Sequence, residues 1–386
     1  MANDVTDLNA LYEAFRASVR GSAWKEETQL FERDFLSEII KLKNELESRA
    51  YKTSPTSEFT IHERGKIRCI HGSRMRDRVV RHSFCDNILT PKLEKYLISN
   101  NCASRKGKGI AKAREMFERD LHNYWLEHRT NDGYVGFMDF SKFYDNIRHD
   151  EVRKAIAPKL DEFGQWLLDE ILRSFRIDAS YMSDSEYAHC MDEKFNSVEY
   201  YQSISPYQRT GKRYMEKSVD IGDQTSQNIG TYLPTRIDNL AKIVHGVKRY
   251  GRYMDDIYII GQTREEVRAA MADITREATE MGLYINDKKT HIARLSKPFK
   301  YLQIRYYLTD SGRVVKRINP KSITRERRKL KAYKRLMDRG EMPYERIEQS
   351  YKSWMGANVR MMSKKQIKGM KTLYEQLFER SPRWKK

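Results

Sequence analysis

Two neighbouring acids stand inside a short apolar stretch in the second half of the chain. Residues 251–262 read Gly-Arg-Tyr-Met-Asp-Asp-Ile-Tyr-Ile-Ile-Gly-Gln, which places Asp255 and Asp256 between a Tyr-Met step and a β-branched run. Because side chains alternate between the two faces of a strand, both acids cannot be ordinary core residues. The pattern predicts a β-hairpin with carboxylates at its tip. A solvated turn is the alternative, but surface turns seldom need so apolar a return strand.

A third acid, Asp139, stands at the end of another predicted strand. Residues 134–147 read Tyr-Val-Gly-Phe-Met-Asp-Phe-Ser-Lys-Phe-Tyr-Asp-Asn-Ile, and the apolar residues before Asp139 are typical of a buried strand that turns into a helix. Adjacent carboxylates repel each other unless a cation lies between them, and hard divalent ions prefer oxygen ligands. Three acids brought together in this way could hold two metal ions.

The composition favours a polyanionic partner. The chain has 386 residues with a formal net charge of +19 and a sequence pI of about 9.5, and its 24 tyrosines offer stacking surfaces for nucleotides. The four cysteines are widely spaced, which indicates reduced thiols. No apolar run has the length of a membrane span, and the first ten residues lack a basic and apolar signal. We therefore expect a cytoplasmic nucleic-acid-binding protein without a membrane partner.

Two predicted phosphate-binding residues lie on a hairpin near the N-terminus. Residues 59–70 alternate around Arg64-Gly65, which places Lys66 and Arg68 on one face of the second strand. Together they could hold a triphosphate, Arg68 through its planar guanidinium and Lys66 as a point charge. The alternative is an ordinary exposed face of a hairpin.

Two glycine-containing loops are further candidates for contacts with nucleic acid. Residues 101–109 are predicted to form a basic loop that lacks the Gly-Lys-Ser/Thr ending of a P-loop, so we expect it to contact the phosphate backbone of a nucleic-acid strand rather than to hydrolyse a nucleotide. Gly222 permits close approach to a nucleotide, and Ser226 and Gln227 follow one turn later, where they can contact a template base or sugar. The basic residues of the first loop assigned to nucleic-acid binding are Arg105, Lys106 and Lys108.

Several of these motifs resemble one family. Tyr-Met-Asp-Asp at 253–256 resembles the catalytic signature of reverse transcriptases. Asp-Arg-Val-Val at 77–80 and the basic loop at 105–109 resemble the fingers of reverse transcriptases from diversity-generating retroelements and related bacterial enzymes. Ile-Gly-x-x-x-Ser-Gln at 221–227 resembles the third polymerase motif of bacterial reverse transcriptases, although Ile221 stands where many retroviral-type enzymes have Gln. The resemblance extends from about residue 59 to 360, and the order of the motifs makes it specific.

The resemblance implies roles for individual residues. Tyr144 would pack under the sugar and exclude a ribose 2′-hydroxyl, and Lys289 would contact the leaving pyrophosphate. The stretch 299–308 occupies the place of the primer grip, although Gln303 stands where the family usually has Gly. The predicted metal ligands are Asp139, Phe140, Asp255 and Asp256; the catalytic set is Asp139, Asp255, Asp256 and Lys289; the nucleotide-binding set is Lys66, Arg68, Phe140, Tyr144, Gly222, Ser226 and Gln227.

The C-terminal part is strongly basic and helical from Ser322 onward. An apolar stripe accompanies the bases, which predicts a thumb-like helix that holds duplex phosphates. The remaining nucleic-acid-binding residues that we predict are Arg78, Tyr301, Arg325, Arg328 and Lys331.

The implied architecture is an α+β right-hand polymerase with fingers, a palm that contains an antiparallel sheet, and a helical thumb. We expect an N-terminal helical segment at 1–50, fingers at 51–133, a palm at 134–295, and the primer-grip hairpin with the thumb at 296–386. From 179 to 217 the sequence is polar and rich in tyrosine without a clear period, which predicts an inserted loop that is functional or mobile. For this loop we favour stacking on bound RNA, with a partner surface or disorder as alternatives.

The predicted enzyme is an RNA-directed DNA polymerase, a nucleotidyltransferase that uses two Mg²⁺ ions, with Mn²⁺ as a substitute. Its expected partners are a template RNA of the structured noncoding kind, a primer or cDNA product, and dNTPs, with an accessory protein or a homo-oligomer as further options. We favour a role in bacterial anti-phage defence. The alternatives are an error-prone enzyme of a diversity-generating retroelement and, from another class, a non-catalytic RNA-binding protein.

Overall fold

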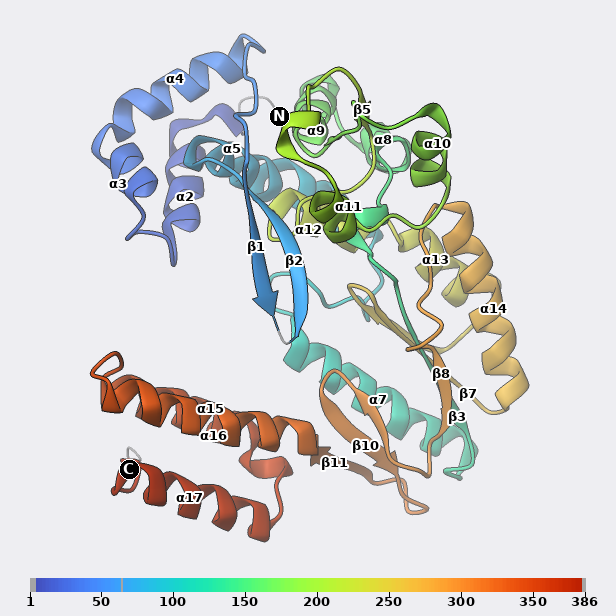
Figure 1. The fold of residues 1–386 in the computed structure, drawn as a ribbon. Coiled ribbons are helices and arrows are strands. Elements are labelled where there is room, and N and C mark those ends of the chain that lie inside the picture. The colour runs from blue at the N-terminus through green and yellow to red at the C-terminus, as the bar shows by residue number, and fades with distance from the viewer. Residues whose placement is uncertain (1–4, 64, 384–386) are drawn as a thin grey trace. The chain divides into compact units, whose positions relative to one another are not determined.

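The computed structural model describes residues 5–63 and 65–383, with the side chains of residues 63, 66 and 206 left aside. Helices and antiparallel sheets alternate along the chain, which confirms the predicted α+β class (Figure 1). Two compact units divide the chain. The first comprises 1–113, 136–259 and 265–291, and the second comprises 114–135, 260–264 and 292–386.

The chain begins with a cluster of amphipathic helices, as the spacing of its apolar residues predicts. Phe15 contacts both Phe31 and Phe35, at ring-centroid distances of 5.5 and 4.9 Å, so aromatic side chains join the three helices. These helices are α2 (Leu8–Val19), α3 (Glu26–Arg33) and α4 (Phe35–Glu47).

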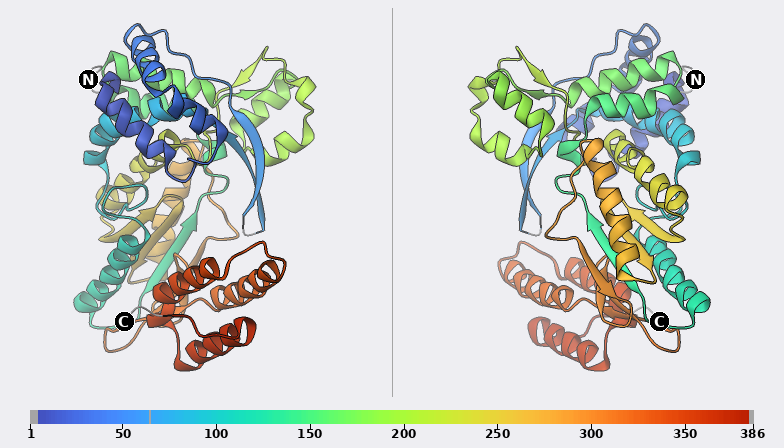
Figure 2. Two further views of the ribbon diagram at one scale, coloured as in Figure 1. Left: turned by 90° about the vertical axis from the view of Figure 1, so that its left-hand side faces the viewer. Right: turned by 90° about the vertical axis from the view of Figure 1, so that its right-hand side faces the viewer.

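The predicted hairpin is confirmed by strands β1 (Ser57–Glu63) and β2 (Lys66–Gly72), which pair antiparallel. In its register Glu58 lies opposite His71, and Ile61 lies opposite Arg68. Figure 2 shows the hairpin from two sides. The side chain of Lys66 lies outside the described residues, so its predicted role stays a prediction.

A four-stranded sheet carries both acidic segments. Its strand order is β6-β7-β3-β8, with β3 (Tyr134–Asp139), β6 (Arg249–Tyr253), β7 (Asp256–Gly261) and β8 (His291–Arg294). Helix α14 (Arg264–Glu280) packs closely on β3, because a Cβ at Gly136 would lie 2.5 Å from Met271 and 2.7 Å from Val267. Glycine at this position therefore lets the helix approach the central strand.

The first unit contains several further helices, some of which end in short 3-10 or π turns. The α-helices are α5 (Met75–Phe84), α6 (Thr90–Leu93), α8 (His149–Ile156), α9 (Glu162–Ser174), α12 (Gln224–Tyr232) and α13 (Thr235–Asn239). The short turns are η1 (Cys85–Leu89), η2 (Glu94–Tyr96), η3 (Tyr144–Asn146), η4 (Ala157–Lys159) and η6 (Leu240–Val244).

The expectation of an irregular loop at 179–217 was wrong. This stretch, together with the two residues before it, folds into β4 (Ile177–Asp178), α10 (Asp184–Asp192), α11 (Ser197–Ser203), η5 (Pro206–Gln208) and β5 (Tyr214–Met215). Buried apolar residues that include Met182, Phe195 and Tyr200 form a hydrophobic core of its own. The helices are too short for their apolar period to stand out in the sequence. We call residues 177–217 the inserted subdomain.

The second unit contains most of helix α7 (Ile110–His128), a small sheet and three C-terminal helices. The sheet has the order β11-β10-β9, with β9 (Phe299–Tyr301), β10 (Ile304–Leu308) and β11 (Val314–Ile318). The helices α15 (Pro320–Asp338), α16 (Tyr344–Asn358) and α17 (Lys364–Phe378) pack around one hydrophobic core, which confirms the predicted helical bundle.

Candidate active site

Backbone hydrogen bonds bring the two acidic segments together. Strand β3 ends at Asp139, and the next amide, Phe140 N, donates to Asp255 O at 3.3 Å. On the other side, Asn286 N donates to Asp139 O at 2.7 Å. The Asp139 side chain is largely buried, with 7% of the residue exposed. The predicted adjacency of Asp139 and the Asp255 turn is therefore confirmed.

The hairpin turn is held by a buried arginine. Met254 has a φ of +56°, a left-handed conformation that costs free energy for a non-glycine residue. Arg252 Nη1 donates to Met254 O at 3.1 Å, and Nη2 donates to Thr231 O at 2.8 Å on helix α12. The same guanidinium binds both carboxylate oxygens of Asp238, at 2.8 and 2.7 Å. Arg252 thus fixes the backbone one residue before Asp255.

Arg252 and Asp238 are both fully buried, with 0% of each residue exposed. Burial disfavours the charged guanidinium, but the charge and hydrogen bonds of Asp238 together with the contribution of Tyr250 outweigh it and raise the pKa of Arg252. The Tyr250 hydroxyl also donates to Asp238 Oδ1, at 2.7 Å. Sequence reasoning missed this pair. The signal was Arg252 itself, a charged residue beside Gly251 and directly before the Tyr-Met-Asp-Asp motif.

Lys289 lies directly against Asp139. Its Nζ is 2.6 Å from each carboxylate oxygen, and its side chain is 47% exposed. The lysine predicted to contact the leaving pyrophosphate is therefore in the same site as the first acid. Its neighbour Lys288 is exposed and has no such position in the site.

In the described part of the chain, no three His, Cys, Asp or Glu side chains are arranged closely enough to hold a metal ion. The donors nevertheless fit a hard divalent cation in kind. Asp139 and the Asp255 turn are adjacent, and a positive charge, Lys289 Nζ, lies against the Asp139 carboxylate. Carboxylate oxygens are the ligands that Mg²⁺ prefers. Asp256 begins β7, directly after this turn.

Tyr144 lies beside the turn. Its hydroxyl is 3.6 Å from Met254 Sδ, and burial raises its pKa, as does the nearby charge of Asp255, while Arg68 acts in the opposite direction. Arg68, Tyr144 and Asp255 are therefore close enough to share one electrostatic environment. Phe140, by contrast, is buried and stacks on Phe143 at a centroid distance of 5.1 Å.

Helix α12 packs tightly against Phe143 and against the turn that contains Met254. A Cβ at Gly230 would lie 3.1 Å from the Phe143 ring and 3.3 Å from Met254 Sδ. The close approach needs glycine at this position, and it brings the segment that begins with Gly222 towards the acidic turn. The start of the helix is fixed by Asp223, whose side chain accepts from Thr225 N and Ser226 N.

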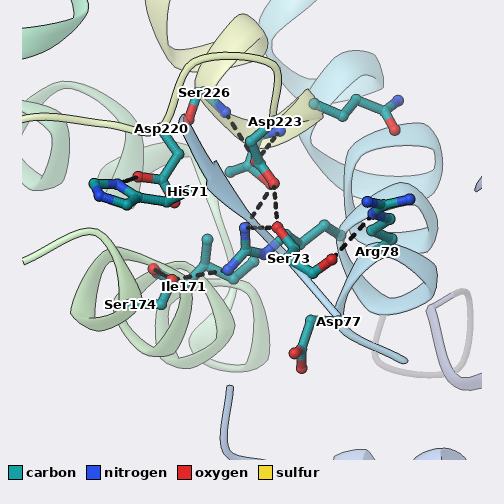
Figure 3. A network of polar contacts seen from close by, with 12 residues as sticks. His71, Ser73, Asp77, Arg78, Ile171, Ser174, Asp220, Asp223 and Ser226 are labelled. Carbon is teal, nitrogen blue, oxygen red and sulfur yellow. Dashed lines mark hydrogen bonds and ion pairs between the residues drawn. The ribbon is translucent and has the colours of Figure 1, made fainter. Parts of the chain in front are cut away.

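Asp223 is itself anchored in a buried polar network (Figure 3). Arg81 Nη1 lies 2.6 Å from Asp223 Oδ2 and 2.8 Å from Ser73 Oγ, and Arg81 Nη2 donates to Ser174 Oγ. The figure also shows the contact between His71 and Asp220, which the structure places at 2.9 Å. These contacts tie β2, α5 and α9 to the segment before α12.

Gly222 has a φ of +94°, and no atom lies within 4 Å of the position that a Cβ would take. With Arg78, it lines a cavity of about 300 Å³ whose other walls include Ile70 and Gly72 of the hairpin. Ser226 is fully buried, and Gln227 accepts a hydrogen bond from Ser104 Oγ at 3.2 Å. Of this predicted group, Gly222 and Arg78 therefore face an open cavity.

The basic loop at 101–109 is held by its own arginine. Arg105 contacts the Glu94 carboxylate and donates to Ile98 O and Asn101 O at 2.8 and 2.6 Å, and its side chain is 7% exposed. Lys108 donates to Ser99 O at 3.1 Å. Lys106 is exposed, which leaves its side chain accessible to a phosphate.

In the second unit, Tyr301 is buried and packs on Phe117 at a centroid distance of 4.5 Å. The turn after it contains Gln303 with a φ of +74°, a conformation that favours the glycine usual in the family. Arg114 secures this turn by donating to Leu302 O. The predicted hairpin of the primer grip therefore forms despite the glutamine.

Helix α15 presents bases on the face away from its hydrophobic core. Arg325, Arg328 and Lys331 are exposed, whereas Ile323 and Leu330 belong to the core. The spacing of three residues between successive bases places them on one side of the helix. The catalytic and binding roles of all these residues stay predictions.

Comparison with known proteins supplies the family. The model for reverse transcriptase (RNA-dependent DNA polymerase) matches residues 55–306, more than half of the chain and all three predicted acids. The protein belongs to this family and is an RNA-directed DNA polymerase, which implies a template nucleic acid, a primer and dNTPs. A search of curated proteins finds no match.

The same comparison confirms the predicted polymerase fold and enzyme class. Reverse transcriptases generally use divalent metal ions, so a metal cofactor is expected in general terms. Within residues 5–63 and 65–383, none of the helices combines the length and the apolar character needed to cross a bilayer.

The buried pair gives a stability prediction. Replacing Asp238 with Ala leaves Arg252 charged, buried and without its carboxylate, so the free energy of unfolding should fall by about 3–5 kcal/mol. Urea unfolding monitored by circular dichroism measures the change. The matched control is Glu162→Gln, which removes an exposed ion pair with Arg49 and should leave the free energy of unfolding nearly unchanged. Equal effects of the two substitutions would contradict the role assigned to the buried pair.

Proposed function

We propose that Asp139, Asp255 and Asp256 hold two Mg²⁺ ions for DNA synthesis on an RNA template. When bound, these ions would activate the primer 3′-hydroxyl and neutralise the triphosphate and the departing pyrophosphate. The observation that supports this most strongly is the hydrogen bond from Phe140 N to Asp255 O, which joins the strand end to the acidic turn.

The surrounding residues have separate tasks in this proposal. Arg68 and Lys66 bind the triphosphate, and Tyr144 lies against the sugar and excludes a ribose 2′-hydroxyl. Lys289, whose side chain is 47% exposed while it is paired with Asp139, transfers its contact to the pyrophosphate and supplies a proton there. Buried Arg252 keeps the Asp255 backbone in place throughout.

Nucleic acid is bound by surfaces on both units. On the first unit, Arg78 and Lys106 contact the template strand, because their positions face an open cavity or solvent, and Gly222 lies against the nucleotide. On the second unit, Arg325, Arg328 and Lys331 of helix α15 contact duplex phosphates. The high net charge of +19 supports an affinity driven by counterion release.

The central test is primer extension on an RNA template with Mg²⁺. Asp139→Asn and Asp255→Asn should each lower the rate of dNTP incorporation by about 100-fold or more, because each removes a charge that stabilises the transition state. The control is Asp287→Asn, an exposed acid in the loop that carries Lys289. It should retain the wild-type rate.

This assay also separates an enzyme from a non-catalytic RNA-binding protein. A protein that only binds RNA would have no use for three converging acids. In that case the wild type would make no DNA, and both Asn variants would bind RNA more tightly. DNA synthesis that continues at full rate in Asp255→Asn would contradict the proposed site.

For the biological role, we propose anti-phage defence with a dedicated structured noncoding RNA as template. The inserted subdomain supports this choice, because it departs from the compact form of the enzymes of diversity-generating retroelements. A mutagenic role in such a retroelement is the second candidate, which the fingers motifs and Ile221-Gly222 favour.

Sequencing the nucleic acid that copurifies with the protein distinguishes these roles. The defence role predicts one discrete structured RNA and its cDNA. A template that matches a nearby variable gene would support the retroelement instead. The Asp255→Asn protein serves as the control, since it should retain the RNA and lose the cDNA.

A further inference from the structure

The two faces of the β1–β2 hairpin have different surroundings. Alternate residues of a strand point to opposite faces, so Arg68 and Ile70 share one face of β2, whereas Cys69 and His71 share the other. The cavity that contains Gly222 is lined by Ile70 and also by His71. On the opposite face, His71 lies across from Glu58 in the strand register. That second face is covered by the inserted subdomain, because α11 packs against β2.

Four side chains make this contact. The Tyr201 ring meets the His71 ring edge-on at a centroid distance of 5.0 Å. The guanidinium of Arg209 lies 4.9 Å from the centroid of the Tyr201 ring, and its Nη1 is 2.5 Å from Glu58 Oε2. Tyr201 and Arg209 thus contact His71 and Glu58, which lie opposite each other on the two strands of the hairpin.

His71 is fixed from a second direction by Asp220. Burial lowers the pKa of His71, but the hydrogen bonds to Asp220 and Cys69 outweigh it and raise this pKa to about 10. The imidazole is therefore protonated at neutral pH and forms an ion pair with a carboxylate two residues before Gly222. The hairpin, the inserted subdomain and the segment before α12 meet at this one side chain.

The other end of α11 is anchored next to Tyr144. The Asp145 carboxylate accepts hydrogen bonds from Ser197 N at 3.1 Å and from Ser197 Oγ at 3.0 Å. Asn146 exchanges two hydrogen bonds with the Phe195 backbone, at 2.8 and 3.1 Å. Asp145 and Asn146 directly follow Tyr144, the residue predicted to pack under the sugar. The subdomain is therefore bound to the segment after β3 at one end and to the hairpin at the other.

We propose that the inserted subdomain is a strut that sets the position of the β1–β2 hairpin relative to Tyr144, with Arg209 and Tyr201 as positioning residues for the incoming nucleotide. This inference rests on the proposed function, since it assumes that Arg68, on the face of the hairpin opposite to His71, binds the triphosphate. The strut acts on binding geometry and not on the acids. Its loss should therefore weaken nucleotide binding more than it slows the chemical step.

The arrangement disfavours the stacking of RNA on most of the subdomain's tyrosines. Tyr200 is buried in the subdomain core and contacts Tyr181 and Phe195. The Tyr201 ring already contacts His71 and Arg209. Tyr207, which is 94% exposed, is different and stays accessible. The tyrosine-rich composition thus serves mainly to build the strut.

The test is steady-state incorporation of a single dNTP by the full chain on a primed RNA template. Arg209→Glu places two acids opposite each other and should raise the KM for dNTP about tenfold, with kcat within about twofold of the wild type. Glu58→Arg should act in the same direction. The double variant Arg209→Glu with Glu58→Arg restores opposite charges and should recover most of the lost affinity.

The matched control is Arg213→Glu. Arg213 is also in the inserted subdomain, also stacks on a tyrosine and also pairs with an acid, but its partners Tyr187 and Asp184 belong to the subdomain itself. This variant should keep the wild-type KM. Thermal unfolding of every variant checks the fold, and Arg209→Gln, which adds no repulsion, provides a milder version of the same change.

The outcomes separate the inference from the function on which it rests. A wild-type protein that extends no primer would overturn the proposed function. If the wild type is active and both Arg209→Glu and Arg209→Gln have the same KM for dNTP as the control Arg213→Glu, the strut is overturned. A fall in kcat alone, or a double variant no better than the two single variants, would also contradict it.

Discussion

The ion pair between Arg252 and Asp238 is the interaction on which the acidic turn depends. Both groups are removed from water, so each needs the other, and the remaining guanidinium donors must find acceptors. They find them in Thr231 O and Met254 O, which fixes the turn to helix α12. A left-handed Met254 persists because its surroundings determine it, and Asp255 is then presented beside Phe140 at the end of β3.

A second buried ion pair supports the segment around Gly222, which is predicted to bind the nucleotide. Arg81 and Asp223 fix the start of α12, which is the helix that Arg252 grips further along through Thr231. Gly230, between these two anchors, lets the helix touch Met254 and the aromatic residues that follow Asp139. One helix of nine residues therefore connects the segment that contains Gly222 to the acids. Rigid support of this kind is what a site that positions two substrates requires.

Much of this could be predicted from the sequence. The strand ending at Asp139, the hairpin with Asp255 at its tip and the hairpin around Gly65 all carry local signals, namely alternation of apolar residues and turn residues between strands. The basic helix α15 was also evident, because its apolar residues and bases lie on opposite faces. Local patterns sufficed wherever one element determines its own conformation.

The buried network and the inserted subdomain could not be predicted in this way. Arg252, Asp238 and Thr231 are distant in the sequence, and their partnership depends on tertiary packing that a local pattern does not record. In the subdomain, α11 has seven residues, and its contacts with His71 and Asp145 stabilise it more than its own periodicity does. Arg105 was predicted to bind phosphate because it is a base in a glycine-containing loop. In the structure its contacts hold this loop together.

The convergence of Asp139 and Asp255 on one metal-binding position is tested most directly by locating the metal itself. Crystals of the protein with a primed template, a non-reactive dNTP analogue and Mn²⁺ would reveal the ions by their anomalous scattering. We predict a Mn²⁺ ion within about 2.3 Å of carboxylate oxygens from both Asp139 and Asp255, with Lys289 displaced from Asp139. An ion bound elsewhere, with Lys289 still paired to Asp139 beside the bound nucleotide, would contradict it.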